Sequence, residues 1–201
     1  MSLASTEDFE TFERLGAIMP PEDKDAALFP VRFNGRWALI HRPISSSHGA
    51  FGAHIWISFS PDMTHWGDHR ILLKAREGGW WDARKIGLSP PPLETDHGWL
   101  MMYHGVRNTA SGSIYRLGLA LLDLENPLRV LKRCREWVFT PVEAYERFGD
   151  VGDVVFPCGW VVVEGEIRLY YGAADTSIGL ATGRLSEVLS WLDEHGSAGD
   201  D

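Results

Sequence analysis

Three stretches of the 201-residue chain resemble one another, and this internal repeat restricts the possible folds more than any other feature. Each stretch begins with a turn glycine at its second position (Gly35, Gly98, Gly165), and a polar ring stands six residues after that glycine. The stretches are NGRWALIHR (34–42), HGWLMMYHG (97–105) and EGEIRLYYG (164–172). A second apolar run follows each one: IWISFSPDM, LGLALLDL and IGLATGRL. Short apolar runs separated by Gly, Pro, Asn and Asp are typical of β-strands.

The spacing of the repeat predicts the architecture. Asp62 and Asp123 lie 61 residues apart, as do Leu124 and Leu185. A period of about 60 residues with about four strands per unit is typical of β-propeller blades. Parallel α/β folds need amphipathic helices between strands, and no such pattern occurs before residue 185.

The repeat also assigns the two ends of the chain. The pattern DFETF that starts at Asp8 matches DMTHW at Asp62, which closes a unit. We therefore expect a single all-β domain over residues 1–201. It consists of a blade end (3–18), three blades (24–80, 81–140 and 148–185), a helix (186–195) and a disordered tail (196–201). The helix is expected to be capped by Ser186 and stopped by Gly196. About three and a half blades do not close a ring and leave strand edges unpaired. Either the chain is a fragment or something else completes it.

Composition excludes several classes of partner. A formal net charge of −9 argues against nucleic acid and anionic membranes. No apolar run approaches the roughly 18 residues of a membrane span, and the polar start MSLASTEDFE is not a signal peptide. Two cysteines, Cys134 and Cys158, are too few for a disulfide scaffold, so a cytoplasmic location is expected.

The usual short catalytic motifs do not occur in the sequence. REGGWW lacks the Lys-Ser/Thr of a P-loop, no GxGxxG opens a helix, and there is no GxSxG. The histidines have neither HExxH nor paired Cys/His spacing, so no metal site is predicted.

Equivalent positions in successive blades converge on the central axis of a propeller, so His41, His104 and Tyr171 are expected to approach one space. Arg42 and Lys85 would bring positive charge there, and a buried cation cluster is costly unless it meets an anion. Taken one at a time, such residues are more often satisfied structural groups.

The sequence leaves two interpretations open for a pair of tryptophans and for a group of acidic residues. Trp80-Trp81 could cap a core or face a sugar ring, which offers an apolar face and a hydroxyl edge. The acidic residues of PVEAYERFGDVGDVVF could form a solvated loop or bind sugar: Glu143, Glu146, Asp150 and Asp153.

A set of motifs, taken in order, is specific where each alone is weak: KDAALFP (24–30), LIHRP (39–43), SPDMTHWG (60–67), WWDARKIG (80–87), GWLMMYHGV (98–106), VVFPCG (154–159) and YYGAAD (170–175). Together they resemble glycoside hydrolase family 130, the β-mannoside phosphorylases and related β-mannosidases, over residues 3–192. The resemblance implies a five-bladed propeller with an axial active site. It also implies that phosphate attacks a terminal β-mannosyl unit with inversion, giving α-mannose 1-phosphate.

The resemblance carries site residues over one by one. Arg42, Lys85 and His104 match the positions that contact phosphate, and Lys24 is a fourth at a position where the family varies. Asp175 matches a carboxylate that binds sugar hydroxyls, and further candidates for the sugar site are Tyr103, His41, Trp80 and Trp81. Phosphate is then a co-substrate, and no cofactor is expected. The partners are a β-mannoside oligosaccharide and phosphate, with a homo-oligomer left open.

One departure from the family is equally informative. The general acid of the family is an Asp in a Glu-Asp-Pro-Arg type segment upstream of KDAALFP, and the 201 residues contain no such segment. We therefore expect no catalytic acid in this chain and little phosphorolysis by it alone. The alternatives are a β-mannoside hydrolase, a non-catalytic carbohydrate-binding propeller, and a truncated gene whose upstream DNA encodes the missing segment.

Overall fold

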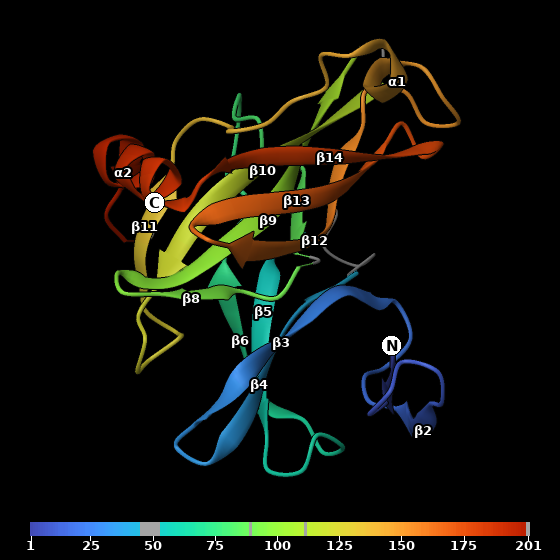
Figure 1. Ribbon diagram of the computed structural model, residues 1–201, viewed down its shortest axis with the longest axis vertical. Helices are drawn as coiled ribbons and strands as arrows, with labels where there is room; N and C mark the ends of the chain where they lie inside the picture. Colours follow the sequence, from blue (N-terminus) through green and yellow to red (C-terminus); the bar gives the residue numbers. More distant parts are fainter. Residues whose placement is uncertain (45–52, 89, 111, 200–201) are drawn as a thin grey trace.

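The computed structural model describes residues 1–44, 53–88, 90–110 and 112–199. Residues 45–52 of the first complete predicted blade and residues 200–201 of the predicted tail lie outside the described residues. Strands form the bulk of the molecule, and they fall into separate antiparallel sheets (Figure 1). The all-β prediction is therefore confirmed.

The first two sheets come from the N-terminal third of the chain. A hairpin pairs β1 with β2, and a four-stranded sheet follows in the order β3-β4-β5-β6. Their bounds are β1 (Ser2–Ser5), β2 (Glu13–Ala17), β3 (Asp23–Phe33), β4 (Arg36–Pro43), β5 (Ile55–Ser60) and β6 (Gly67–Leu73).

The other two sheets come from the rest of the chain. One runs in the order β15-β11-β10-β9-β7, with β8 also paired to β9, and the other in the order β12-β13-β14. Their bounds are β7 (Lys85–Leu88), β8 (Leu93–Thr95), β9 (Gly98–Thr109), β10 (Gly112–Leu122), β11 (Val130–Cys134), β12 (Val155–Val163), β13 (Glu166–Ala173), β14 (Ser177–Arg184) and β15 (Gly196–Ser197).

Successive sheets contact one another through their first strands, as blades do. Strand β7 lies against β3, β4 and β5 of the preceding sheet, and β12 lies against β9 and β10. Among the described residues, β14 pairs with β13 alone, so the blades form an open arrangement rather than a ring. This is the predicted partial β-propeller.

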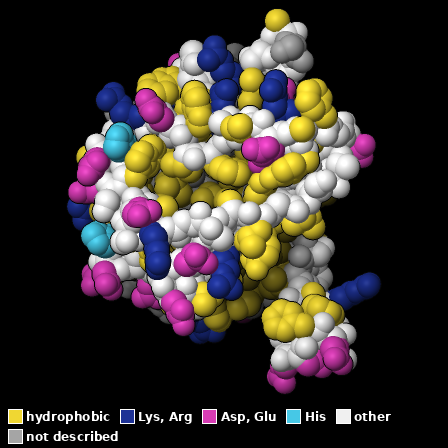
Figure 2. Space-filling view, turned by 45° about the horizontal axis from the view of Figure 1, so that its top comes forward, with side chains coloured by type: hydrophobic (Ala, Val, Ile, Leu, Met, Phe, Trp, Pro, Cys, Tyr) yellow, Lys and Arg dark blue, Asp and Glu magenta, His cyan; other side chains and the backbone are white. Residues whose placement is uncertain are grey.

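The burial of the strands reflects this stacking. Every residue of β9 from Gly98 to Val106 is buried, because the sheet is covered on both faces. Strand β14 instead alternates exposed and half-buried residues, as expected for a sheet with one solvated face. On the face shown in Figure 2, hydrophobic side chains gather in a hollow, with charged side chains scattered around it.

The repeat in sequence is a repeat of turn chemistry. Asn34 and Gly35 both have positive φ, as do Glu164 and Gly165, and this is the geometry of the two-residue turn that suits hairpins. Asp8 and Asp62 each accept two backbone N–H groups from the residues two and three positions on. Asp123 does the same at the end of β10.

The C-terminal helix, α2 (Leu185–His195), begins one residue earlier than expected. Its N-cap is Arg184, which makes no side-chain capping bond, so the predicted Ser186 cap is wrong. The tail is partly ordered, because Gly196 and Ser197 pair with β11 as strand β15. Neither helix in the described part of the chain has the length and apolar character needed to cross a membrane.

A short helix that the sequence did not reveal, α1 (Ala144–Arg147), resolves one open assignment. Glu146 accepts the backbone N–H groups of Val142 and Glu143 and the hydroxyl of Tyr171. Glu146 is buried, and it completes a capping box with Glu143. It is therefore a structural cap, whereas Glu143, Asp150 and Asp153 are solvent-exposed or half-buried.

Candidate functional site

Four basic residues meet where three blades approach one another. Lys24 at the start of β3 pairs in register with Arg42 at the end of β4, and Lys85 begins β7. His104 lies on β9 directly opposite Gly87 of β7. The charges of Arg42, Lys85 and Lys24 all act on His104, so the structure brings the four predicted phosphate residues into one cluster. We call these four the cation cluster.

One carboxylate lies inside the cation cluster. Oδ2 of Asp25 accepts bonds from Nε and Nη2 of Arg42 at 2.6 and 2.5 Å, and it lies 3.5 Å from Nε2 of His104. The backbone of Asp25 has φ +53°, at a point where the β3–β4 register shifts. Asp25 therefore fixes the guanidinium of Arg42 through Nε and Nη2, and Nη1 has no hydrogen-bond partner among the described residues.

A glycine makes this arrangement sterically feasible. A Cβ at Gly87 would lie 2.3 Å from Oδ2 of Asp25 and 2.6 Å from Cε1 of His104. A Cβ does not approach non-bonded atoms that closely, so any side chain at this position would push the carboxylate and the imidazole away.

His104 is held in its neutral form. Burial lowers the pKa of its imidazole well below the ordinary value, and the positive charges of Arg42, Lys85 and Lys24 lower it further. A neutral ring donates from one nitrogen. Nδ1 of His104 is buried without a hydrogen-bond partner among the described residues, and the ring of Phe156 lies 4.6 Å away. With neutral His104, the three cations and Asp25 leave two positive charges, which match a phosphate dianion.

The other predicted residues lie elsewhere. His41 is buried between Asp23 and Ser58, at 2.7 Å from each, and Ser58 also bonds to His69. Tyr171 bonds to Glu146 and Tyr145. Each of the rings of His41, His104 and Tyr171 thus has its own set of partners, and their convergence on one space stays a prediction.

Two of the sugar candidates belong to the core. Trp81 stacks on Tyr103 with ring centroids 5.6 Å apart, and both side chains are buried. Trp81 donates to the carbonyl of Arg135, and Tyr103 donates to Asp82. Both rings are closed to a ligand in this structure. Trp80 is 40% exposed, under the guanidinium of Arg76, and Asp175 is exposed at the turn between β13 and β14.

Beneath Tyr103 lies a second ionic group, which we call the Asp82 cluster. Oδ2 of the fully buried Asp82 accepts bonds from Arg76 at 3.1 Å, Arg133 at 2.7 Å and the hydroxyl of Tyr103 at 3.1 Å.

Sequence reasoning missed both Asp25 and Asp82. Their one available signal was position, since each lies within a quoted motif, in KDAALFP and WWDARKIG.

The comparisons with known proteins agree with one another. Residues 1–194 match the family model Glyco_hydro_130, described as beta-1,4-mannooligosaccharide phosphorylase. The chain is 38% identical over 199 residues to a Beta-1,4-mannooligosaccharide phosphorylase of Ruminococcus albus, covering 98% of this chain and 58% of that protein. It is 42% identical over 192 residues to a Beta-1,2-mannobiose phosphorylase of Listeria innocua, covering 96% and 52%.

The solved structures give the same result. A structure of the Listeria innocua Beta-1,2-Mannobiose phosphorylase in complex with beta-1,2-mannobiose superposes with a TM-score of 0.88 at 41% identity, covering 96% of this chain and 53% of that one. The chain thus spans between half and three-fifths of the length of these relatives. The order of the motifs, the family model and the superposition together establish that the chain belongs to glycoside hydrolase family 130.

Proposed function

We propose that this chain supplies the phosphate-binding part of a β-mannoside phosphorylase. The reaction moves a terminal mannosyl unit from its glycosidic oxygen to inorganic phosphate, giving α-mannose 1-phosphate, and it needs no cofactor. The observation that carries the proposal is the cation cluster: three cations, one internal carboxylate and a neutral imidazole, with a net charge that matches a phosphate dianion.

Each member of the cluster has a distinct task in this proposal. Arg42, fixed by Asp25, offers an oriented guanidinium N–H, and Lys85 supplies a point charge. The ammonium of Lys85 lies 5.1 Å from the ring centroid of Tyr115, and no described carboxylate forms an ion pair with it. His104 donates one N–H, and the exposed Lys24 adds charge at the rim. Asp175, whose carboxylate is exposed, is the proposed sugar contact.

The cation cluster favours phosphorolysis over hydrolysis. A hydrolase activates water with a carboxylate and has no use for a group of cations at the attacking position. The relatives are named for β-1,4- and β-1,2-linked mannosides, so either linkage is a candidate for this chain's substrate. Because the 201 residues contain no Glu-Asp-Pro-Arg type segment, we expect this chain alone to bind phosphate without rapid turnover.

A phosphate titration followed by calorimetry tests the proposal. Lys85→Gln should weaken phosphate binding by about tenfold, because a desolvated charge contact of about 1.4 kcal/mol is lost. Arg14→Gln removes an exposed cation on β2 and is the matched control. Equal phosphate affinity in the parent chain and in Lys85→Gln would contradict the assignment.

A product assay separates the alternatives. The chain is incubated with β-1,4- or β-1,2-mannobiose, with and without phosphate. Free mannose in phosphate-free buffer would identify a hydrolase. Sugar binding without any product, even with the complete family domain, would identify a non-catalytic carbohydrate-binding protein.

Two further expectations concern the setting of the chain. We propose a cytoplasmic location, supported by a free, exposed thiol at Cys158 and a free, buried one at Cys134. A homo-oligomer remains an expectation, and light scattering coupled to size-exclusion chromatography measures it.

A further inference from the structure

A second group of basic side chains lines a pocket outside the cation cluster. The pocket has a volume of about 570 Å³ and lies between the segment after β6, the segment before β7 and the far end of β9. Its ionisable lining residues are His54, Lys74, Arg76, Glu77, Arg84 and Arg107. Arg42, Lys85 and His104 are not among its lining residues. We call this the basic pocket.

The cations of the basic pocket are not neutralised by the protein. No carboxylate of the described residues forms an ion pair with Lys74, Arg84 or Arg107, and all three side chains are exposed. Glu77 is the one acidic residue among the described lining residues. Arg76 differs, because its guanidinium is committed to Asp82 and to the carbonyl of Cys134.

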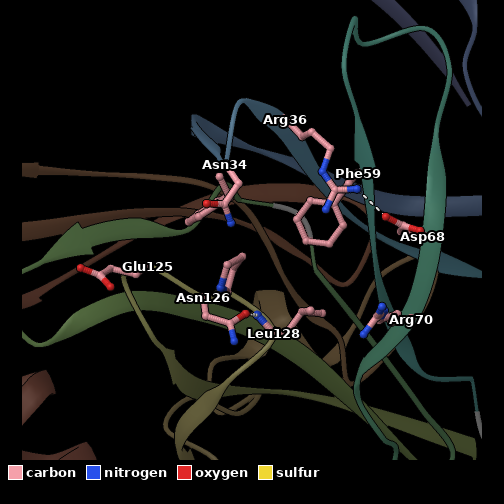
Figure 3. A pocket seen from close by; sticks show the side chains of 10 residues that line it. Asn34, Arg36, Phe59, Asp68, Arg70, Glu125, Asn126 and Leu128 are labelled. Atoms are coloured by element: carbon pink, nitrogen blue, oxygen red, sulfur yellow. Dashed lines mark hydrogen bonds and ion pairs between the residues drawn. The ribbon is translucent and has the colours of Figure 1, made fainter.

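A smaller pocket near the β3–β4 turn contains an arginine whose charge is neutralised. In Figure 3, Arg36 reaches across this pocket to Asp68, with which it forms an ion pair, and its guanidinium lies over the ring of Phe59. The volume of that pocket is only about 100 Å³. In a chain with 28 acidic and 19 basic residues, the basic pocket thus gathers three unpaired cations around one space.

The basic pocket also carries neutral hydrogen-bond donors. Nδ1 of His54 accepts the backbone N–H of Ala75 at 3.0 Å, which leaves Nε2 to carry the proton of the neutral ring. Burial lowers the pKa of His54, and the charges of Lys74 and Arg133 lower it further, so the ring is neutral at pH 7. Asn108 adds an amide to the lining.

We propose that the basic pocket is a second anion-binding site, which takes the phosphate or carboxylate group of a sugar. Its volume falls within the roughly 300–1,000 Å³ of small-molecule sites. Extended polyanions are disfavoured by the net charge of −9 on the whole chain. The indole of Trp80 lies 4.6 Å from the guanidinium of Arg76, beside the pocket, and a half-exposed aromatic ring next to polar donors suits a sugar. This inference does not depend on the proposed phosphorylase function.

The experiment titrates the chain with four probes: mannose 6-phosphate, glucuronate, mannose and inorganic phosphate. Affinities come from calorimetry, and the place of binding from amide chemical shifts. Mannose 6-phosphate or glucuronate, or both, should bind and shift the amides of Ala75, Arg107 and Asn108, whereas neutral mannose should not. Binding by only one of the two identifies the anionic group and supports the proposal.

Variants then test the assignment. The double variant Lys74→Gln/Arg107→Gln should weaken binding of the anionic sugar at least tenfold. Arg14→Gln/Arg135→Gln removes the same charge from exposed positions elsewhere and should have little effect. Lys85→Gln should spare this binding while weakening that of inorganic phosphate, which separates the basic pocket from the cation cluster.

Three results would overturn the proposal. The first is no binding by either anionic sugar, and the second is mannose binding as tightly as mannose 6-phosphate. The third is an equal loss of affinity in Lys74→Gln/Arg107→Gln and in the control pair, which would show general electrostatic attraction rather than a site.

Discussion

The Asp82 cluster and the cation cluster contain the same kinds of residue but use them differently. In the Asp82 cluster, each cation has several acceptors supplied by the protein. Arg133 donates to Asp82, to the hydroxyl of Tyr103 and to the carbonyl of Lys74, and Arg76 donates to Asp82 and to the carbonyl of Cys134. Such a network holds the segment before β7 against β9 and β11 and gives each guanidinium acceptors from the protein itself.

In the cation cluster, one carboxylate faces more positive charge than it neutralises. Asp25 binds Arg42, while Lys85 and Lys24 have no carboxylate partner among the described residues. The contrast shows that ionic groups are distinguished by which cations lack an acceptor from the protein, rather than by their composition. An anion site needs cations that are fixed in place but still short of acceptors.

The largest expected effect is in the Asp82 cluster. Asp82→Asn leaves two buried guanidinium groups without a counter-charge and should lower the free energy of unfolding by about 3–5 kcal/mol. Urea denaturation measures this change, and Asp68→Asn, in the exposed pair with Arg36, is the control with a small effect. A small effect of Asp82→Asn as well would show that the two ionic groups do not differ in this way.

An intermediate effect is expected at the glycine that makes room for Asp25. Gly87→Ala should destabilise the chain by about 1–3 kcal/mol and weaken phosphate binding at least tenfold, because the new methyl group displaces Asp25 and His104. The control is Gly183→Ala on β14, where a Cβ would meet nothing within 4 Å. If folded Gly87→Ala binds phosphate as tightly as the parent chain, the position of Asp25 does not matter for phosphate binding.

The smallest effect concerns pH. The folded-state pKa of His104 is depressed, mainly by burial, so the unfolded chain takes up its proton first as pH falls below the ordinary value of about 6.5. The contribution of His104 to the free energy of unfolding is therefore complete above pH 6.5. Below that pH the free energy of unfolding decreases, by up to about 1.4 kcal/mol per pH unit for this one group. His104→Gln should reduce that slope between pH 7.0 and 5.5 in urea denaturation, although His54, whose pKa is also lowered, keeps its own contribution.

His65→Gln, at an exposed ring, is the control for the pH experiment. An unchanged slope in His104→Gln would mean that the imidazole can be protonated within the cluster. The cation cluster would then resemble the Asp82 cluster in tolerating its full charge.

The repeated parts of the molecule could be predicted from the sequence, because turns and strand periodicity are local. The turns at Gly35 and Gly165 share one geometry and the aspartate turns at Asp8 and Asp62 share another. The third turn glycine, Gly98, differs, because its φ is +141° and His97 has no positive φ. What a repeat cannot predict is the partner of an equivalent side chain. Tyr171 is bonded by Glu146 from α1, an element with no counterpart in the repeat.

The residues predicted to bind phosphate came from the family resemblance, and the structure adds what holds these side chains in place. The position of Asp25 depends on a left-handed backbone conformation and a register shift, neither of which has a signal in the composition of KDAALFP. Tyr103 and Trp81 were expected at a sugar site because aromatic rings suit sugars, but their polar atoms are used by Asp82 and Arg135 in the core. Aromatic residue type alone does not distinguish the two roles.

Among the described residues, one side of β14 has no strand partner, and this has a consequence for the behaviour of the chain in solution. A free edge presents a row of N–H and C=O groups to any extended segment that approaches, and Ile178 and Leu180 on this strand are 81% and 54% exposed. Such an edge is a template for strand addition. Purified at high concentration, the chain should therefore form β-rich assemblies that grow from this side, and a lysine placed at Ile178 should slow their growth.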